Sequence, residues 1–371
     1  MRMLAALVLM LAPQAEVTRA DLARAYTRFE QVYFPAKLEP QKKRALNRAY
    51  DEACLAFFGG ERRKLVDELE RLSVELGAKP MAPEVEAPAY DWDGCRMTML
   101  VALSRVEAKS PAMVQALATA RARAALLRTR PSPEQLAEFF ADRRKLATEL
   151  DREIGALQRG DDPYRRRTGD LWRVVALQPG ELALRIYAPA QAAKDEPLPL
   201  LIALHGARGD ENMFLDGYGL GRIRALADQH GFLLACPRTG GQLEPETLEA
   251  LLAALALDYA IDEQRIGLLG HSMGAGVAAR LAAARPERFS ALACFSGGPR
   301  PGVERLPPAW LRVGAIDQLA DPAGLEATAK ELRERGLAID FQVLPDLGHT
   351  LIVGEALDGA VAWLLGHRRP R

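Results

Sequence analysis

The sequence has little that would direct it to nucleic acid, to a membrane or to a disulfide-bonded scaffold. Lys plus Arg and Asp plus Glu both number 49, so no global field attracts nucleic acid or an anionic lipid surface. No apolar run of 18 residues follows the N-terminal segment, and we therefore expect no stable membrane anchor. Four cysteines in 371 residues are too few and too scattered for a zinc site or a disulfide framework.

The four cysteines divide into two kinds. Cys54 and Cys95 share the N-terminal half and could pair in an exported protein. Cys236 and Cys294 lie inside apolar, strand-like runs, which predicts that they are buried as small hydrophobic residues. Cysteine usage alone does not indicate the compartment.

The first 15 residues resemble a secretory signal peptide. The stretch "MRMLAALVLMLAPQAEV" has one Arg, then an apolar run from Leu4 to Ala12, with cleavage expected near Ala15. This predicts a secreted or periplasmic protein. Pro13 stands where an A-x-A cleavage site would have a small residue, so the alternative is a cytoplasmic protein whose first helix begins with these residues.

Residues 16–165 are predicted to form a helical domain. Two charged segments, "ERRKLVDELERLSVEL" and "DRRKLATELDREIGAL", each carry one apolar stripe at steps of three and four residues, which is typical of an amphipathic helix. The stripes are Leu65, Leu69, Leu72 and Leu76 in the first segment, and Leu146, Leu150, Ile154 and Leu157 in the second.

The two helical segments also resemble each other. "LAFFGGERRKLVDELE" (55–70) aligns without gaps on "LAEFFADRRKLATELD" (136–151). This favours a duplicated helical hairpin in a bundle of four or more helices, with convergence of two amphipathic helices as the alternative. Because this half has no clustered His, no Gly-rich phosphate loop and no paired Cys, we expect it to serve as a scaffold, to bind a partner, to form a homo-oligomer or to cover the other domain.

Residues 166–371 have the pattern of an α/β domain. "LWRVVAL" and "LALRIYAP" flank a Pro179-Gly180 turn and predict a β-hairpin. Short apolar runs then alternate with helical stretches, which predicts a mostly parallel sheet with helices on both faces. The expected buried strands are "LPLLIALHG", "FLLACPR", "RIGLLG", "ALACFSGG", "AWLRVGAID" and "IDFQVLP".

A serine at the end of one of these strands has the setting of a nucleophile elbow. In "RIGLLGHSMGAG" a strand delivers Ser272, and an Ala-rich helix follows at once. Gly270, Gly274 and Gly276 are expected to remove Cβ atoms that would clash in the sharp turn. The N-terminus of the helix would direct its dipole at the serine, where an oxyanion would develop.

A serine nucleophile needs a base, and elimination among the histidines favours one of them. The chain has His205, His230, His271, His349 and His367. His271 adjoins Ser272 and is expected to point elsewhere, while the other three excluded histidines follow an early strand, precede a strand or lie in the basic tail. His349, in "LPDLGHTL", follows the last strand at the carboxyl edge of the sheet, where a base can reach Ser272.

The third member of the site should be a carboxylate after the strand between serine and histidine. Asp317 comes directly off the strand in "AWLRVGAIDQLADP" and is favoured. Asp321 precedes Pro322 and has the position of a helix cap. The order Ser272, Asp317, His349 is the order expected of an α/β-hydrolase.

An oxyanion hole requires two backbone N–H groups. Met273, directly after the serine, is expected to supply one. The other should come from the loop after "LLIALHG", with Ala207 favoured and Arg208 second. For this loop taken alone, a plain Gly-rich turn is the alternative.

The motifs "LHGARGDENMF", "GHSMGAG", "VGAID" and "DLGHT", in that order, resemble those of compact bacterial esterases of the α/β-hydrolase superfamily. The similar groups are the carboxylesterase/phospholipase type and the polyhydroxybutyrate-depolymerase-like "predicted peptidases". The resemblance covers residues 170–366 and implies Ser272 as nucleophile, His349 as base, Asp317 as acid, and Ala207 and Met273 as oxyanion donors. The loop after "LLACPR" lacks the longer, aromatic-bearing insert expected of such esterases.

The sequence therefore predicts a serine hydrolase that cleaves carboxylic esters, small or polymeric, through an acyl-enzyme and without metal or cofactor. A serine peptidase or an acyltransferase would use the same triad. The alternative from another class is an inactive hydrolase scaffold whose helical domain binds a partner. Whether the helical half covers the serine is the observation that would most limit the choice of substrate.

Overall fold

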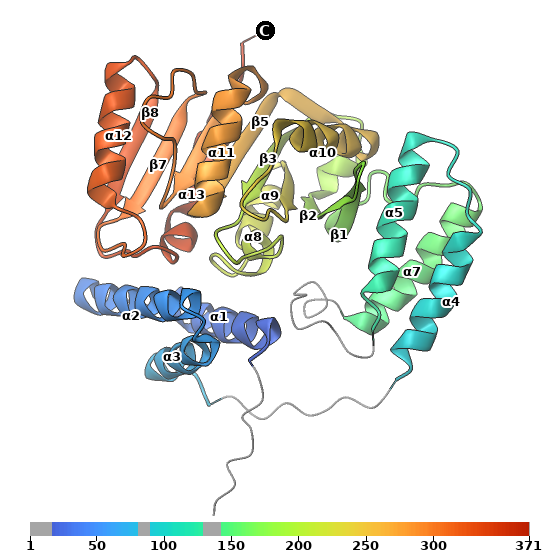
Figure 1. The fold of residues 1–371 in the computed structure, drawn as a ribbon, viewed down its shortest axis with the longest axis horizontal. Helices are drawn as coiled ribbons and strands as arrows, with labels where there is room; N and C mark the ends of the chain where they lie inside the picture. The colour runs from blue at the N-terminus through green and yellow to red at the C-terminus, as the bar shows by residue number, and fades with distance from the viewer. Residues whose placement is uncertain (1–16, 81–89, 129–141, 371) are drawn as a thin grey trace, which may run out of the picture.

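The computed structural model describes residues 17–80, 90–128 and 142–370 (Figure 1). The expected signal segment, residues 1–15, lies outside this range, and so do residues 136–141 of the second repeat copy. Among the described residues, no helix is long and apolar enough to cross a membrane.

The α/β domain contains one eight-stranded sheet with the order β1-β2-β4-β3-β5-β6-β7-β8. β1 and β2 form the predicted antiparallel hairpin, and β2 pairs antiparallel with β4. The remaining neighbours are parallel, so the carboxyl ends of β3 to β8 meet at one edge. The strands are β1 (Gly169–Ala176), β2 (Glu181–Ala188), β3 (Leu198–Leu204), β4 (Leu233–Pro237), β5 (Ile261–His271), β6 (Ala291–Phe295), β7 (Ala309–Gly314) and β8 (Ile339–Leu344).

Helices cover both faces of this sheet, as the nearly continuous apolar strands predict. One face forms a core with α10 (Pro245–Asp258), α11 (Met273–Ala284) and α12 (Pro322–Glu334). The other face forms a core with α8 (Met213–Asp216), α9 (Ile223–His230) and α13 (Ile352–Gly366). Every residue of β3 except its first is buried, as are all residues of β4, β6 and β7, because each lies between two helical layers.

The described residues of the helical half contain helices and no strand, as predicted, but they form two groups rather than one bundle. α1 (Arg19–Tyr33), α2 (Pro40–Phe58) and α3 (Arg62–Glu75) share one core, which includes Leu351 of the α/β domain. α4 (Trp92–Ser104), α5 (Pro111–Ala125) and α7 (Arg143–Gln158) share another, which includes Leu171 of β1. Figure 1 shows the first group below the loops of the sheet and the second beside β1.

The predicted apolar stripes lie in these two cores. Leu65, Leu69 and Leu72 of α3 are buried in the first, and Leu76 lies partly buried at its end. The four residues of the α7 stripe are buried in the second. Cys54 and Cys95 are free thiols that pack in different groups, so they do not form the disulfide that the sequence left open, whereas Cys236 and Cys294 are buried as predicted.

Candidate active site

Ser272 occupies a strained turn between β5 and α11. Its backbone has φ 53° and ψ −120°, a conformation that costs a serine on the order of 1–3 kcal/mol. The Ser272 N–H donates to the carbonyl of Phe295 at 2.8 Å, which ties the turn to the neighbouring strand β6. The side chain is thereby presented at the carboxyl edge of the sheet.

Close backbone approaches around this turn require glycine at two of the three predicted positions. A Cβ on Gly270 would lie 2.4 Å from the carbonyl oxygen of Gly274, and a Cβ on Gly274 would lie 2.1 Å from that of Leu204. The prediction for Gly276 is wrong, because a Cβ there would meet nothing within 4 Å. Gly276 already lies in the first turn of α11, beyond the tight part of the elbow.

The three polar side chains predicted to meet do form a hydrogen-bonded series. Ser272 Oγ lies 2.8 Å from His349 Nε2. His349 Nδ1 lies 2.9 and 3.0 Å from the two carboxylate oxygens of Asp317. Asp321 is not part of this series, because its side chain accepts from the N–H of Ala323 and caps α12. The chain folds this way because all three residues follow parallel strands, β5, β7 and β8.

The environment of Asp317 keeps it ionised. Burial by itself would raise the pKa of Asp317, but the hydrogen bond from His349 and that from the Ala320 N–H together lower the pKa below its usual value. A carboxylate bonded to Nδ1 selects the tautomer in which Nε2 of His349 is free to accept a proton from Ser272.

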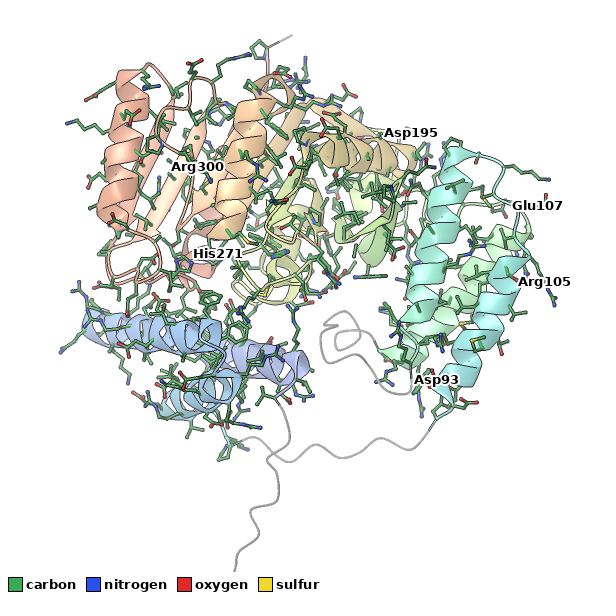
Figure 2. All side chains as sticks on the ribbon, in the orientation of Figure 1. Asp93, Arg105, Glu107, Asp195, His271 and Arg300 are labelled. Atoms are coloured by element: carbon green, nitrogen blue, oxygen red, sulfur yellow. The ribbon has the colours of Figure 1, made fainter. Side chains whose placement is uncertain are left out.

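His271 contributes in a way that sequence reasoning missed. Its Nε2 lies 2.9 Å from the carbonyl oxygen of His349, and its Nδ1 lies 2.7 Å from the hydroxyl of Tyr218. Burial lowers the pKa of His271 to about 3, so the ring is neutral, Nε2–H donates to His349 and Nδ1 accepts from Tyr218. Figure 2 labels His271 on the side of the α/β domain that faces α1 and α2.

The remaining histidines do not reach the serine. His205 is buried and accepts from the Thr239 N–H through Nε2, while its Nδ1 donates to the carbonyl of Gly206. His230 is the last residue of α9. His367 follows α13 and bonds to the carbonyl of Trp363.

Two backbone N–H groups near the serine lack an acceptor within the described part of the chain. They belong to Ala207, on the loop after β3, and to Met273, the first residue of α11. Ala207 and Ser272 line the same pocket. Gly206, next to Ala207, donates its N–H to the hydroxyl of Tyr218 at 3.2 Å, which fixes the start of this loop. Arg208, the second candidate donor, has a positive φ of 59°.

A pocket of about 140 Å³ separates the serine from the N-terminal helices. Ser272, His349 and Ala207 lie on one side, and residues of α1 to α3 form the other, so these helices cover the serine. Most of the helical side chains that line the pocket are apolar or aromatic. They include Leu22, Ala23, Tyr26, Tyr50, Phe57 and Leu65.

Polar side chains of α1 and α2 also bind loops of the α/β domain. The Glu30 carboxylate accepts from the N–H groups of Gly219 and Leu220 at 3.0 and 2.9 Å, and burial raises the pKa of Glu30 to about 7. The Asp51 carboxylate accepts from the N–H of His349 at 2.7 Å. No local motif marks Glu30 or Asp51, since each is an acidic residue on a charged helix.

With this sheet order, this elbow and this series of side chains, the C-terminal domain has the predicted α/β-hydrolase fold. No family model and no curated protein matches the sequence.

Solved structures similar to the C-terminal half are esterases and other serine hydrolases. A thermostable esterase is 18% identical, with 54% of this chain and 63% of that chain covered and a TM-score of 0.44. The chain thus spans less than two thirds of that esterase. An S-formylglutathione hydrolase from Agrobacterium tumefaciens is 19% identical over 54% of this chain and 96% of its own, with a TM-score of 0.43. A feruloyl esterase module from Clostridium thermocellum is 12% identical over 56% and 90%, with a TM-score of 0.47. These values describe a likeness of fold.

Proposed function

We propose that the protein hydrolyses carboxylic esters through an acyl-enzyme formed on Ser272. The observation that carries the proposal is the continuous series from Ser272 Oγ through His349 to Asp317, at 2.8 and 2.9 Å. Serine alone is a weak nucleophile at neutral pH, and an adjacent imidazole held by a carboxylate supplies the base it needs.

In the first half-reaction, Ser272 Oγ attacks the ester carbonyl carbon while its proton passes to His349 Nε2. The carbonyl oxygen becomes an oxyanion, and the N–H groups of Ala207 and Met273 donate to it. The C–O bond to the alcohol then breaks, and His349 returns the proton to the departing oxygen. The product of this half-reaction is an ester of the acyl group with Ser272.

In the second half-reaction, water attacks the acyl carbon and His349 Nε2 takes a proton from it. The bond to Ser272 Oγ breaks, that oxygen regains a proton from His349, and the carboxylic acid leaves. Asp317 stays ionised throughout and stabilises the imidazolium that forms twice in each cycle.

The covered serine favours small esters over polymers. The pocket of about 140 Å³ has walls on α1 to α3 and on the α/β domain, and most of the side chains on its helical wall are apolar or aromatic. We propose that it binds a short apolar part of the ester.

The test is turnover of p-nitrophenyl acetate and butyrate by the wild-type protein and by Ser272→Ala. We expect the variant to lose roughly 10³-fold or more in kcat, as in other serine hydrolases. Ser104→Ala is a matched control, because Ser104 ends α4, does not line the pocket, and donates to the carbonyl of Val101. Equal rates in wild type and Ser272→Ala would contradict the proposal.

The alternatives use the same side chains and differ in substrate. A peptidase would cleave aminoacyl amides faster than matched esters, and an acyltransferase would pass the acyl group to an added alcohol in preference to water. An inactive scaffold would not react with a fluorophosphonate probe, whereas the proposed hydrolase is labelled at Ser272.

A further inference from the structure

The loop that carries His349 is held from outside the α/β domain. The His349 N–H donates to Asp51 Oδ2 at 2.7 Å, and the Gly348 N–H donates to Asn47 Oδ1 at 2.9 Å. Asp51 and Asn47 both belong to α2, and each is only 1% exposed. A Cβ on Gly348 would lie 2.4 Å from Asp51 Oδ2, so the loop approaches α2 as closely as a glycine permits.

These contacts complete the restraint on His349. Within the α/β domain, the carbonyl of His349 accepts from His271, and its ring is held between Asp317 and Ser272. The remaining polar group of its backbone, the N–H, is bound by α2. Rotation of the backbone at this position would move Nε2 away from Ser272 Oγ. Such displacements of about 1 Å can reduce catalysis by roughly two orders of magnitude.

The acceptor in this contact is a carboxylate, although a neutral side chain could also accept from an N–H. Burying a carboxylate costs several kcal/mol more than burying an amide, unless the charge has a favourable partner. His349 is that partner when it takes the proton from Ser272, because the imidazolium carries a positive charge next to Asp51. Asp51 thus binds the backbone of the base from the helical side, whereas Asp317 binds its ring from the sheet side.

Building on the function proposed above, we propose that Asp51 is a positioning residue for His349, and that its charge stabilises the protonated imidazole during catalysis. The N-terminal helices then supply a residue that positions the base, in addition to lining the pocket.

Three variants test this proposal with p-nitrophenyl butyrate. Asp51→Leu removes both acceptor and charge, and we expect kcat to fall about 30- to 100-fold with KM changed less than twofold. Asp51→Asn keeps an acceptor but not the charge, and at pH 8.5 we expect its kcat to be about three- to tenfold above that of Asp51→Leu and still about tenfold below wild type. Val66→Ala is the control, because Val66 lies in the core of α1 to α3 and does not line the pocket, and trimming it should lower Tm and leave kcat within twofold.

A pH series separates a charge effect from a purely structural one. Burial raises the pKa of Asp51 to about 7. The other titratable groups that act on it are Asp317 and His349, from the loops after β7 and β8, and Cys54, one turn along α2. The ratio of wild-type kcat to Asp51→Asn kcat should therefore rise from near one at pH 6 to about ten at pH 8.5, because the wild-type carboxyl is ionised only at the higher pH.

Two results would overturn the proposal: a kcat for Asp51→Leu within twofold of wild type, or a wild-type to Asp51→Asn ratio that does not change between pH 6 and 8.5. If Asp51→Leu does not fold, the Asp51→Asn ratio decides alone. Failure of the proposed function would differ, because then wild type itself would not turn over the ester and Ser272→Ala would change nothing.

Discussion

The two helical groups of the N-terminal half are built alike but contact different parts of the α/β domain. Among the described residues each group has three helices, and the last of the three begins with Arg-Arg-Lys-Leu. α1 to α3 lie against the loops around Ser272. The group of α4, α5 and α7 lies against β1, where Thr119 and Arg123 donate to carbonyls of that strand. Figure 2 labels Asp93, Arg105 and Glu107 in this second group, far from His271.

The two groups dock at different places because of polar residues that lie outside their apolar stripes. Leucine stripes bury each helix in its own group, but they do not select a docking surface. Glu30 and Asp51 bind loop N–H groups and so place α1 and α2 over the serine. Thr119 and Arg123 bind strand carbonyls and place α5 along the edge strand β1, which would otherwise present unpaired backbone groups. The first group is expected to affect activity and the second only stability.

The largest expected effect is a loss of stability from two matched substitutions, each of which leaves a cavity in one of the two helical cores. Leu69 and Leu150 are both fully buried, so Leu69→Ala and Leu150→Ala should each cost about 2–5 kcal/mol of unfolding free energy. On warming, Leu69→Ala should lose ester turnover before the α/β domain unfolds, because the cover over Ser272 loosens first. Leu150→Ala should keep its activity up to that temperature.

Circular dichroism and ester turnover measured over the same temperature range would check this difference. Loss of activity ahead of unfolding in Leu150→Ala would remove the distinction between the two groups.

The second prediction concerns the pH dependence of stability that arises from Glu30. Glu30 has a folded-state pKa of about 7, raised by burial, so the folded protein binds an extra proton between about pH 4.5 and 7. Protonated Glu30 therefore contributes fully to the free energy of unfolding at low pH, and roughly 3 kcal/mol of this free energy is lost as the pH rises through 7. Glu30→Gln keeps an acceptor for Gly219 and Leu220 without the charge.

We expect the Tm of Glu30→Gln minus that of wild type to increase from pH 5 to pH 8. The comparison with wild type matters because other carboxylates, such as Asp317, shift in the opposite direction. A constant Tm difference across this range would show that Glu30 does not titrate near neutrality.

The smallest expected effect is on the preference for acyl-chain length. Phe57 lines the pocket, and the guanidinium of Arg208 lies 5.4 Å from the centre of its ring. Phe57→Ala should enlarge the space and raise kcat/KM for p-nitrophenyl octanoate relative to acetate about tenfold, since two more buried methylene groups contribute roughly 1.6 kcal/mol. Tyr90→Ala removes an exposed aromatic ring beside α4 and is the matched control. A similar change in both variants would contradict the assignment of the pocket.

Much of the α/β domain could be predicted because its signals are local. Each strand is a short apolar run, and Ser272, Asp317 and His349 each lie within a few residues after one, so the parallel order of the sheet brings them to one edge. Gly276 was predicted wrongly because a G-x-S-x-G-x-G pattern does not distinguish a glycine in the elbow from one in the following helix.

The role of the helices could not be predicted because it depends on contacts between distant segments. Asp51 and Glu30 are acidic residues on charged helices, where a solvent-exposed side chain is the usual outcome. Their burial results from docking onto loops that lie about 190 to 300 residues further along the chain. His271 was excluded as a base for a sound reason, but its bond to the carbonyl of His349 has no signal in the sequence.

The order of these segments along the chain has a consequence for biosynthesis. Asp51 leaves the ribosome 298 residues before His349, the residue whose backbone it binds. At roughly 5–20 residues per second, the loop that α2 binds is synthesised on the order of 15–60 s after this helix. The nascent chain therefore has no assembled nucleophile during this interval, and the active site can form only after the segment that carries His349 has emerged.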